Sequence, residues 1–261
     1  MTDSTAAQQN DTSMMTMMEH LRELRSRIVK VAIAVSVTSV AAFFFYDQIY
    51  DFLTEPYCKA IEGTDQACEF IFLNLTSPFA TKLRVSGYAG LLLASPMVFY
   101  QLWSFIAPGL YRKEKRYAVS FVVGSVVLFL LGAALAFISM PAIFSWLASQ
   151  AGDAVIQNRV EEYLGLLVIM VVAFGISFEF PLLLVVLQIF GVLKPSTLTT
   201  YRRHAIVGIA AFVAAVTPGG DPVSLAVLSV PLVLFYEASI IIGRIIVKRR
   251  AEAAAEAERT R

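Results

Sequence analysis

The sequence predicts an all-α membrane protein with six transmembrane helices and both termini in the cytoplasm. The first observation is composition, since 57% of the residues are hydrophobic and only 16% are charged, whereas an ordinary soluble domain carries about 25% charged residues. The second is the absence of Asp, Glu, Lys and Arg from Val85 to Tyr111 and from Tyr117 to Gly152. A helix needs about 20 apolar residues to cross the hydrocarbon core, so each stretch is long enough.

In chain order, six apolar segments qualify as spans. They are Ile28–Tyr46, Val85–Ala107, Tyr117–Ile138, Tyr163–Phe190, Ala205–Val216 and Val223–Gly243. The fifth holds only twelve residues, about 18 Å of helix. We therefore expect it to form a shallow hairpin with the sixth and to thin the bilayer locally. A re-entrant fifth segment is the alternative. Prolines within or just after four of the spans, at Pro96, Pro141, Pro181 and Pro231, predict curved helices and a bundle that is not cylindrical.

The third observation is the position of the basic residues, which sets the orientation of a membrane protein. All but four of the 21 Lys and Arg residues lie at the N-terminal flank of the first span, Lys30 in its first turn included, or at and beyond the end of an even-numbered span. The opposite side receives Lys59, Lys82, Arg84 and Arg159. This distribution predicts that both termini are cytoplasmic. We expect residues 1–18 to be a disordered tail, residues 19–247 to be the membrane domain and residues 248–261 to be a cytoplasmic tail.

The long outside loop, from Asp47 to about Arg84, contains both cysteines of the chain, Cys58 and Cys68. Outside the cytoplasm an oxidant is available, so a disulfide between them is one expectation. Two free thiols are the alternative, and the spacing does not separate the two.

Motifs that carry catalytic chemistry are absent from the sequence. The two histidines, His20 and His204, lie far apart at predicted membrane edges, and no metal-spaced Cys/His cluster, nucleophile elbow or phosphate-binding loop occurs. We therefore expect no enzymatic activity, no cofactor and no metal site. Nucleic-acid binding is not supported, because the basic residues form short clusters beside apolar segments.

Glu179 is the acid that membrane physics points to, since apolar residues flank it on both sides. A charged acid at that depth costs roughly 2.5 to 3.5 kcal/mol, so its side chain must face protein, water or a partner. The simpler alternative is a structural acid bonded to a neighbouring helix, and we favour a functional role. A secondary transporter or proton channel could use such a residue, although no inverted repeat or acidic relay accompanies it.

The segment from Met18 to Arg27 predicts a short helix lying along the membrane surface. Leu21, Leu24 and Ile28 fall at positions i, i+3 and i+7 and form one apolar stripe. Glu23 stands four residues before Arg27, which predicts a surface salt bridge as the simplest role for this acid.

Three runs of sequence resemble the family of the twin-arginine translocase subunit TatC. They are HLRELRSRI from His20, SPFATKLRVSGYAGLLLASPMVFYQLWSFIAPGLYRKEKRY from Ser77 and AFGISFEFPLLLVVL from Ala173. The similarity in motif order and spacing extends from His20 to about Gly243. It implies a mitt-shaped bundle in the cell membrane and a receptor for signal peptides that carry two consecutive arginines.

The resemblance also implies the residues that bind this peptide. They are Glu23, Glu114, Leu21, Arg25 and Phe105. A carboxylate binds a guanidinium through two parallel hydrogen bonds, which lysine cannot reproduce, so the two acids suit a pair of arginines.

Partner subunits are implied as well, namely TatA and, where present, TatB, in a self-assembled complex that uses the proton-motive force and lies among membrane lipids. By resemblance Glu179, Thr217 and Asp221 contact partners and Pro56 is structural. The turn TPGGDP from Thr217 is one residue longer than the family's usual T-P-P-D, and Leu225 stands where some members have Gln. A polar partner contact near this turn is therefore missing or replaced. A scaffold without a recognition site is a third function class.

Overall fold

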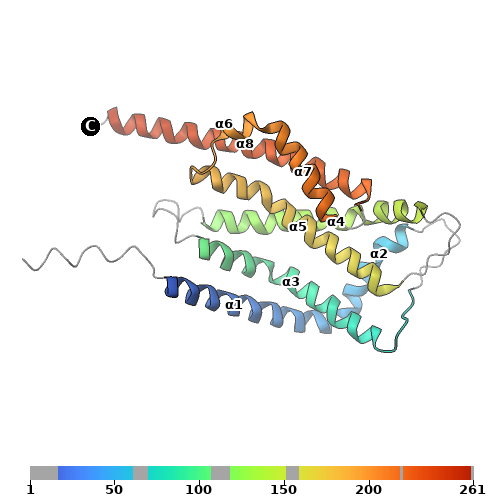
Figure 1. Cartoon of the computed structure of the whole chain (residues 1–261). Helices are drawn as coiled ribbons and strands as arrows, with labels where there is room; N and C mark the ends of the chain where they lie inside the picture. Colours follow the sequence, from blue (N-terminus) through green and yellow to red (C-terminus); the bar gives the residue numbers. More distant parts are fainter. Residues whose placement is uncertain (1–16, 61–69, 107–117, 151–158, 218–219, 260–261) are drawn as a thin grey trace, which may run out of the picture. The chain divides into compact units, whose positions relative to one another are not determined.

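The computed structural model describes residues 17–60, 70–106, 118–150, 159–217 and 220–259. Within these residues the protein is helical apart from turns and one isolated β-bridge between Ile71 and Arg159. The helices, drawn in Figure 1, are α1 (Met17–Phe44), α2 (Tyr46–Ala60), α3 (Ser77–Ile106), α4 (Ala118–Gln150), α5 (Val160–Ile189), α6 (Pro195–Thr200), α7 (Arg202–Val216) and α8 (Pro222–Arg259). The all-α prediction is confirmed.

Five helices in the described part are long and apolar enough to cross a membrane. Their qualifying segments are Leu21–Phe44, Ser77–Phe105, Val119–Gln150, Val160–Ile189 and Pro222–Arg249. Each overlaps one of the predicted spans. The remaining predicted span corresponds to α7, which has 15 residues and is therefore about 22 Å long, shorter than the ~30 Å hydrocarbon core.

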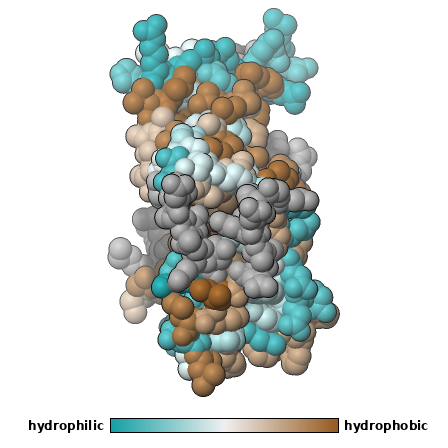
Figure 2. Space-filling model, turned by 90° about the vertical axis from the view of Figure 1, so that its right-hand side faces the viewer, coloured by the Kyte–Doolittle hydropathy of each residue, from teal (hydrophilic) through white to brown (hydrophobic). Residues whose placement is uncertain are grey.

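Large apolar side chains lie exposed along these helices. Val37, Ile138 and Leu234 are examples from α1, α4 and α8, and apolar residues, in brown, reach the surface on the face shown in Figure 2. Exposed apolar area on this scale marks a membrane or protein contact rather than a surface in water. The protein is therefore a multi-pass membrane protein.

Three local predictions are corrected by the structure. The apolar stripe that includes Leu21 is part of the continuous helix α1, because no helix breaker separates the stripe from the span. The predicted outside loop contains α2, and α3 begins at Ser77 rather than Val85. The early start of α3 is stabilised by Lys82, whose ammonium lies 5.0 Å from the centre of the Tyr46 ring.

The described residues belong to two compact units. The first contains α1, the part of α3 from residue 86 onward and the start of α4. Thr38 Oγ1 of α1 donates a hydrogen bond to the Gly90 carbonyl of α3 over 2.7 Å. A Cβ on Gly90 would lie only 2.2 Å from Ser39 Oγ, so this close approach of two helices requires glycine.

The second unit contains α2, the start of α3, most of α4 and all of α5 to α8. Within it, α4 and α5 approach closely at two glycines, because a Cβ on Gly132 would lie 2.6 Å from the Phe174 carbonyl oxygen and one on Gly175 would lie 2.6 Å from Phe129. Small residues permit such contact between membrane helices. Helices α5, α6 and α7 all pack against α8 (Figure 1), so the predicted α7–α8 hairpin is present.

Helix α8 continues beyond its apolar segment. It has 38 residues, which corresponds to about 57 Å, and the segment suited to a membrane ends at Arg249. The remaining turns, to Arg259, extend the helix by about 15 Å past that point. Prolines lie inside five of the helices, at Pro56, Pro96, Pro141, Pro181 and Pro231.

Candidate functional site

Glu23 lies on α1, one turn before Arg27, and its side chain is only 23% exposed. Arg27 Nε donates to Glu23 Oε1 over 3.1 Å, and Nη2 of the same guanidinium also contacts Oε1. The third guanidinium nitrogen, Nη1, donates to Oε1 of Gln101 on α3 over 3.4 Å. The i, i+4 salt bridge expected from the sequence is therefore confirmed, and it is extended by a buried residue from another helix.

The other carboxylate oxygen of Glu23 has a different environment. Glu23 Oε2 is buried and has no hydrogen-bond partner among the described residues. A buried, unpaired carboxylate oxygen is costly, so it is the acceptor that an incoming donor would satisfy. Because Arg27 holds the carboxylate by Oε1, the direction of Oε2 is set before a ligand arrives.

The remaining residues assigned to peptide binding are distributed around α1 and the end of α3. Leu21 and Arg25 are exposed, and Phe105, in the last turn of α3, is half-buried. Glu114 lies outside the described residues, so a site formed by two carboxylates stays a prediction. Gln101 was missed, although a glutamine near the end of an otherwise apolar segment was a usable signal.

Glu179 lies in the middle of α5 and is half-buried. Ser125 of α4 forms a side-chain hydrogen bond with its carboxyl group. The oxygen Oε1 is buried and has no hydrogen-bond partner in the described part of the chain. The acid is thus bonded to a neighbouring helix, and one oxygen remains available as an acceptor.

Thr217 and Asp221 flank the turn before α8, and both are buried. Thr217 Oγ1 donates to the Val213 carbonyl over 2.8 Å. Asp221 Oδ1 accepts from the Ser224 backbone N–H over 2.6 Å, and Oδ2 accepts from the Ser224 hydroxyl. Asp221 therefore caps the N-terminus of α8, a position that favours aspartate. Contact of these residues with a partner stays a prediction.

Pro56 lies inside α2, where it is buried beside Tyr57. An aromatic cluster fixes this helix, because the Tyr57 ring centre lies 5.5 Å from that of Tyr163 on α5, and Tyr163 Oη donates to the Leu53 carbonyl over 2.6 Å. Phe70 and Phe144 complete the cluster. The neighbouring Cys58 is disulfide-bonded. Cys68 lies outside the described residues, so the pairing of the two stays a prediction.

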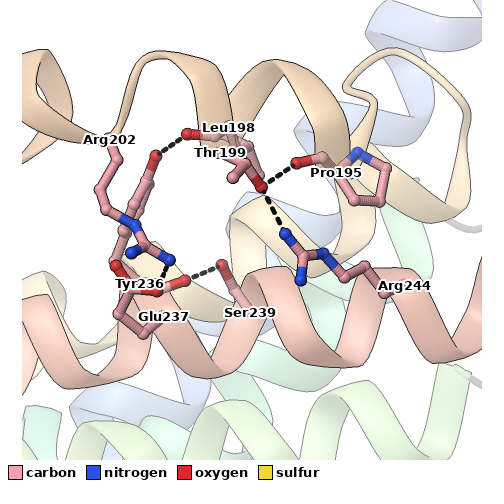
Figure 3. A network of polar contacts seen from close by, with 8 residues as sticks. All are labelled: Pro195, Leu198, Thr199, Arg202, Tyr236, Glu237, Ser239 and Arg244. Carbon is pink, nitrogen blue, oxygen red and sulfur yellow. Dashed lines mark hydrogen bonds and ion pairs between the residues drawn. The ribbon is translucent and has the colours of Figure 1, made fainter.

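A polar network, drawn in Figure 3, joins α6 and the start of α7 to α8. Arg202 Nη2 contacts Glu237 Oε2 at 2.7 Å, and Tyr236 Oη donates to the Leu198 carbonyl over 2.8 Å. Further along α8, Arg244 Nη2 donates to Thr199 Oγ1 over 2.9 Å. Glu237, an acid within the apolar segment of α8, is therefore paired with a cation from the start of α7.

Comparison with known proteins finds a matching family model and close sequence relatives. A family model for the Sec-independent protein translocase protein (TatC) matches residues 19–231. The Sec-independent protein translocase protein TatC of Aquifex aeolicus (strain VF5) is 36% identical over 242 residues, covering 91% of this chain and 98% of that protein. The protein of the same name from Frankia casuarinae is 36% identical over 245 residues, covering 88% of this chain and 66% of that protein's length.

Solved structures agree with the sequence relatives. A crystal structure of the twin arginine translocase receptor TatC superimposes with a TM-score of 0.70 at 36% identity, covering 87% of this chain and 99% of that chain. A second crystal structure of that receptor, in DDM, gives a TM-score of 0.71 and covers 86% of this chain. The likeness therefore extends over nearly the whole helical part.

Proposed function

Because this chain belongs to the Sec-independent protein translocase TatC family and is the receptor subunit of that transport system, we propose that Glu23 and Glu114 bind the two arginines of a twin-arginine signal peptide. The observation that carries the proposal is the environment of Glu23. Its Oε1 is held by Arg27, and its buried Oε2 has no partner among the described residues.

The chemistry of the pair suits arginine better than lysine. A guanidinium presents several N–H donors in a fixed plane, so it can satisfy Oε2 and also bond to a second acceptor nearby. Glu114 lies in the short run Arg112 to Arg116, which is rich in basic residues. An acid from this loop would supply the second acceptor, while Leu21 and Phe105 contact the apolar part of the peptide.

The proposed topology has six crossings, with both termini in the cytoplasm. Helix α7 would be the short crossing, which requires a locally thinned bilayer because its 15 residues span about 22 Å. The basic residues support the orientation, since most of them flank the same side of the alternating spans. Labelling of a Ser196→Cys variant from outside intact cells, relative to the parent protein, would contradict this topology.

The protein is a component of a multi-subunit translocation system, and we propose TatA and TatB as its partner subunits, with transport driven by the proton-motive force. Glu179 is the candidate contact for a partner helix, because its Oε1 is a buried acceptor within a spanning helix. An acceptor in this position favours a polar group from a second helix. Thr217 and Asp221, which precede α8, are the other two candidate contacts for a partner.

A proton channel or secondary transporter that uses Glu179 is the second candidate function. The unpaired Oε1 is the observation that favours it. Against it, Glu179 is the only acid in the sequence between Glu162 and Asp221, so no relay of acids adjoins it along α5, α6 or α7. Ion flux through the purified chain in vesicles, without a partner subunit or signal peptide, would favour the channel.

This pair of carboxylates, Glu23 and Glu114, would form a clamp on the two arginines, and the clamp is tested by titrating a twin-arginine signal peptide into the detergent-purified full chain. Glu23→Ala and Glu114→Ala should each weaken binding by about 30-fold or more, since removing one partner of a buried charge pair costs roughly 2–5 kcal/mol. Glu55→Ala is the matched control, because Glu55 forms the same i, i+4 salt bridge, with Lys59, on α2.

Two results would contradict the clamp. The first is that Glu55→Ala weakens peptide binding as much as Glu23→Ala does. The second is that a twin-lysine peptide binds as tightly as the twin-arginine peptide, because the guanidinium geometry would then have no role.

A further inference from the structure

A cavity of about 770 Å³ lies between α6 and α8, within the second unit. This volume is in the range of sites that hold small molecules or headgroups. Three cations line it, Lys194 just before α6 and Arg244 and Lys248 on α8. The hydroxyl-bearing residues that line it are Ser196, Thr199 and Thr200.

Hydrogen bonds join α6 to α8 beside the cavity (Figure 3). Arg244 Nη2 donates to Thr199 Oγ1 over 2.9 Å, and that hydroxyl donates to the Pro195 carbonyl over 2.9 Å. A guanidinium has five N–H donors, so the bond to Thr199 orients Arg244 and leaves further donors for a ligand. The Tyr236–Leu198 hydrogen bond also holds α6 against α8, about two turns of α8 before Arg244.

The charge of the cavity is not neutralised by the protein. Lys194 has no ion-pair partner among the described residues. Lys248 lies 3.8 Å from Glu252, but their side chains are 79% and 63% exposed, and such a pair contributes little. Three cations around one cavity therefore favour an anionic ligand, and the Ser196 hydroxyl that lines the same cavity can donate to a phosphate oxygen.

The cavity also lies at the end of a membrane-spanning segment. Arg244 and Lys248 are in the last turns of the apolar part of α8, which ends at Arg249. Ile241 precedes them by three and seven residues, so it lies on the same side of the helix and nearer the bilayer centre. Ile241 and Ile245 are 57% and 48% exposed. A ligand held by the cations thus has apolar surface beside it.

We propose that this cavity binds the phosphate headgroup of an anionic phospholipid, with its acyl chains against Ile241 and Ile245. The cations neutralise the phosphate, the Ser196 hydroxyl donates to one of its oxygens, and the isoleucines contact the chains. Basic pockets between helices at the membrane edge are a known way of holding anionic headgroups. The apolar surface distinguishes this ligand from a free phosphate, which would not use it.

Native mass spectrometry of the detergent-purified full chain with dioleoylphosphatidylglycerol tests the proposal. We expect one tightly retained lipid per chain, and about tenfold or greater weakening in the variant Lys194→Gln/Arg244→Gln/Lys248→Gln, since each cation contributes to headgroup attraction. The matched control is Arg203→Gln/Arg249→Gln/Arg259→Gln, which removes the same charge from residues that do not line the cavity. It should weaken binding by less than about twofold.

A second variant separates binding from folding. Lys194→Gln/Lys248→Gln keeps the Arg244–Thr199 hydrogen bond, and it should weaken lipid binding by at least about fivefold. Equal loss in the cavity variants and in the control would mean diffuse surface attraction and would overturn the site. Displacement of the lipid by glycerol 3-phosphate at similar concentrations would show a soluble-phosphate site and overturn the lipid.

Discussion

Two carboxylates assigned to binding by family resemblance, Glu23 and Asp221, have opposite environments. Glu23 is held through one oxygen by Arg27, and its second oxygen has no partner among the described residues. Asp221 is 0% exposed, and both of its oxygens accept hydrogen bonds from Ser224. The first acid is positioned and still available to a donor, whereas the second is fully used in starting a helix.

The difference shows that the hydrogen bonds an acid already makes within the protein separate an acid available to a ligand from a structural one. Both acids match positions that resemblance connects with binding, so sequence alone treats them alike. A ligand can satisfy the second oxygen of Glu23 without breaking an existing bond. At Asp221 a ligand would have to replace bonds that cap α8, which would cost stability.

Neutral replacements give the largest expected contrast. Glu23→Gln removes the charge but keeps the shape, and it should weaken binding of a twin-arginine peptide by about tenfold or more, because hydrogen bonds to charged groups contribute roughly 1.5–3 kcal/mol. Asp221→Asn keeps a good cap, and its peptide affinity should stay within about twofold of the parent protein. Fluorescence titration with labelled peptide measures both, and equal losses would end the distinction.

Replacements that lower stability should show the reverse order, with a larger effect at Asp221 than at Glu23. Asp221→Ala removes the cap of α8 and leaves the Ser224 N–H unpaired, so we expect a loss of about 1–2 kcal/mol. Glu23→Ala removes only an i, i+4 salt bridge near the N-terminus of α1, which contributes about 0.3–0.5 kcal/mol to the free energy of unfolding. Thermal unfolding in detergent compares the two through their apparent melting temperatures. A larger drop for Glu23→Ala would show that this acid is structural.

Replacement of Arg27 tests whether this residue competes with the peptide for the carboxylate of Glu23. Arg27 occupies Oε1 of Glu23 and adds a positive charge beside an incoming guanidinium. Arg27→Gln should therefore raise the affinity for the twin-arginine peptide by about twofold, the scale of an i, i+4 ion pair. Arg27→Lys, which keeps the charge, serves as the control. A clear fall in affinity for Arg27→Gln would mean that orientation of Glu23 outweighs competition for it.

The smallest effect is expected at Thr217. Its hydroxyl bonds to the Val213 carbonyl of its own helix, so Thr217→Val should lower the free energy of unfolding by less than about 1 kcal/mol. Peptide binding should not change. Reduced co-purification of partner subunits with the Val variant, at an unchanged melting temperature, would contradict this expectation. The buried hydroxyl would then have a role in assembly.

The apolar spans were predictable because hydrophobic content and absence of charge are local properties. Helices α2 and α6 were not, for reasons that lie elsewhere in the chain. Helix α2 contains Pro56 and several charges, and it is fixed by Tyr163, more than a hundred residues later. Helix α6 has only six residues, and its anchor on α8 is formed by side chains such as Tyr236.

In the candidate site, too, the contacts within one helix were predictable and those between helices were not. The Glu23–Arg27 pair follows from helical spacing alone, but the contact with Gln101 requires knowing that α1 and α3 pack together. At Asp221 a local signal was present, since Pro222 is the first residue of α8 and Ser224 follows in its first turn. Resemblance favoured a partner contact there, and the capping chemistry was the simpler prediction.

The length of α8 has a mechanical consequence. Because the helix continues about 15 Å beyond its apolar segment, it can act as a lever whose fulcrum lies near Arg244 and Lys248. A tilt of the embedded part, which is about 35 Å long, would swing Arg259 at the end of an arm of about 20 Å on the water side. Whatever occupies the cavity at the fulcrum would then set the angle of that arm.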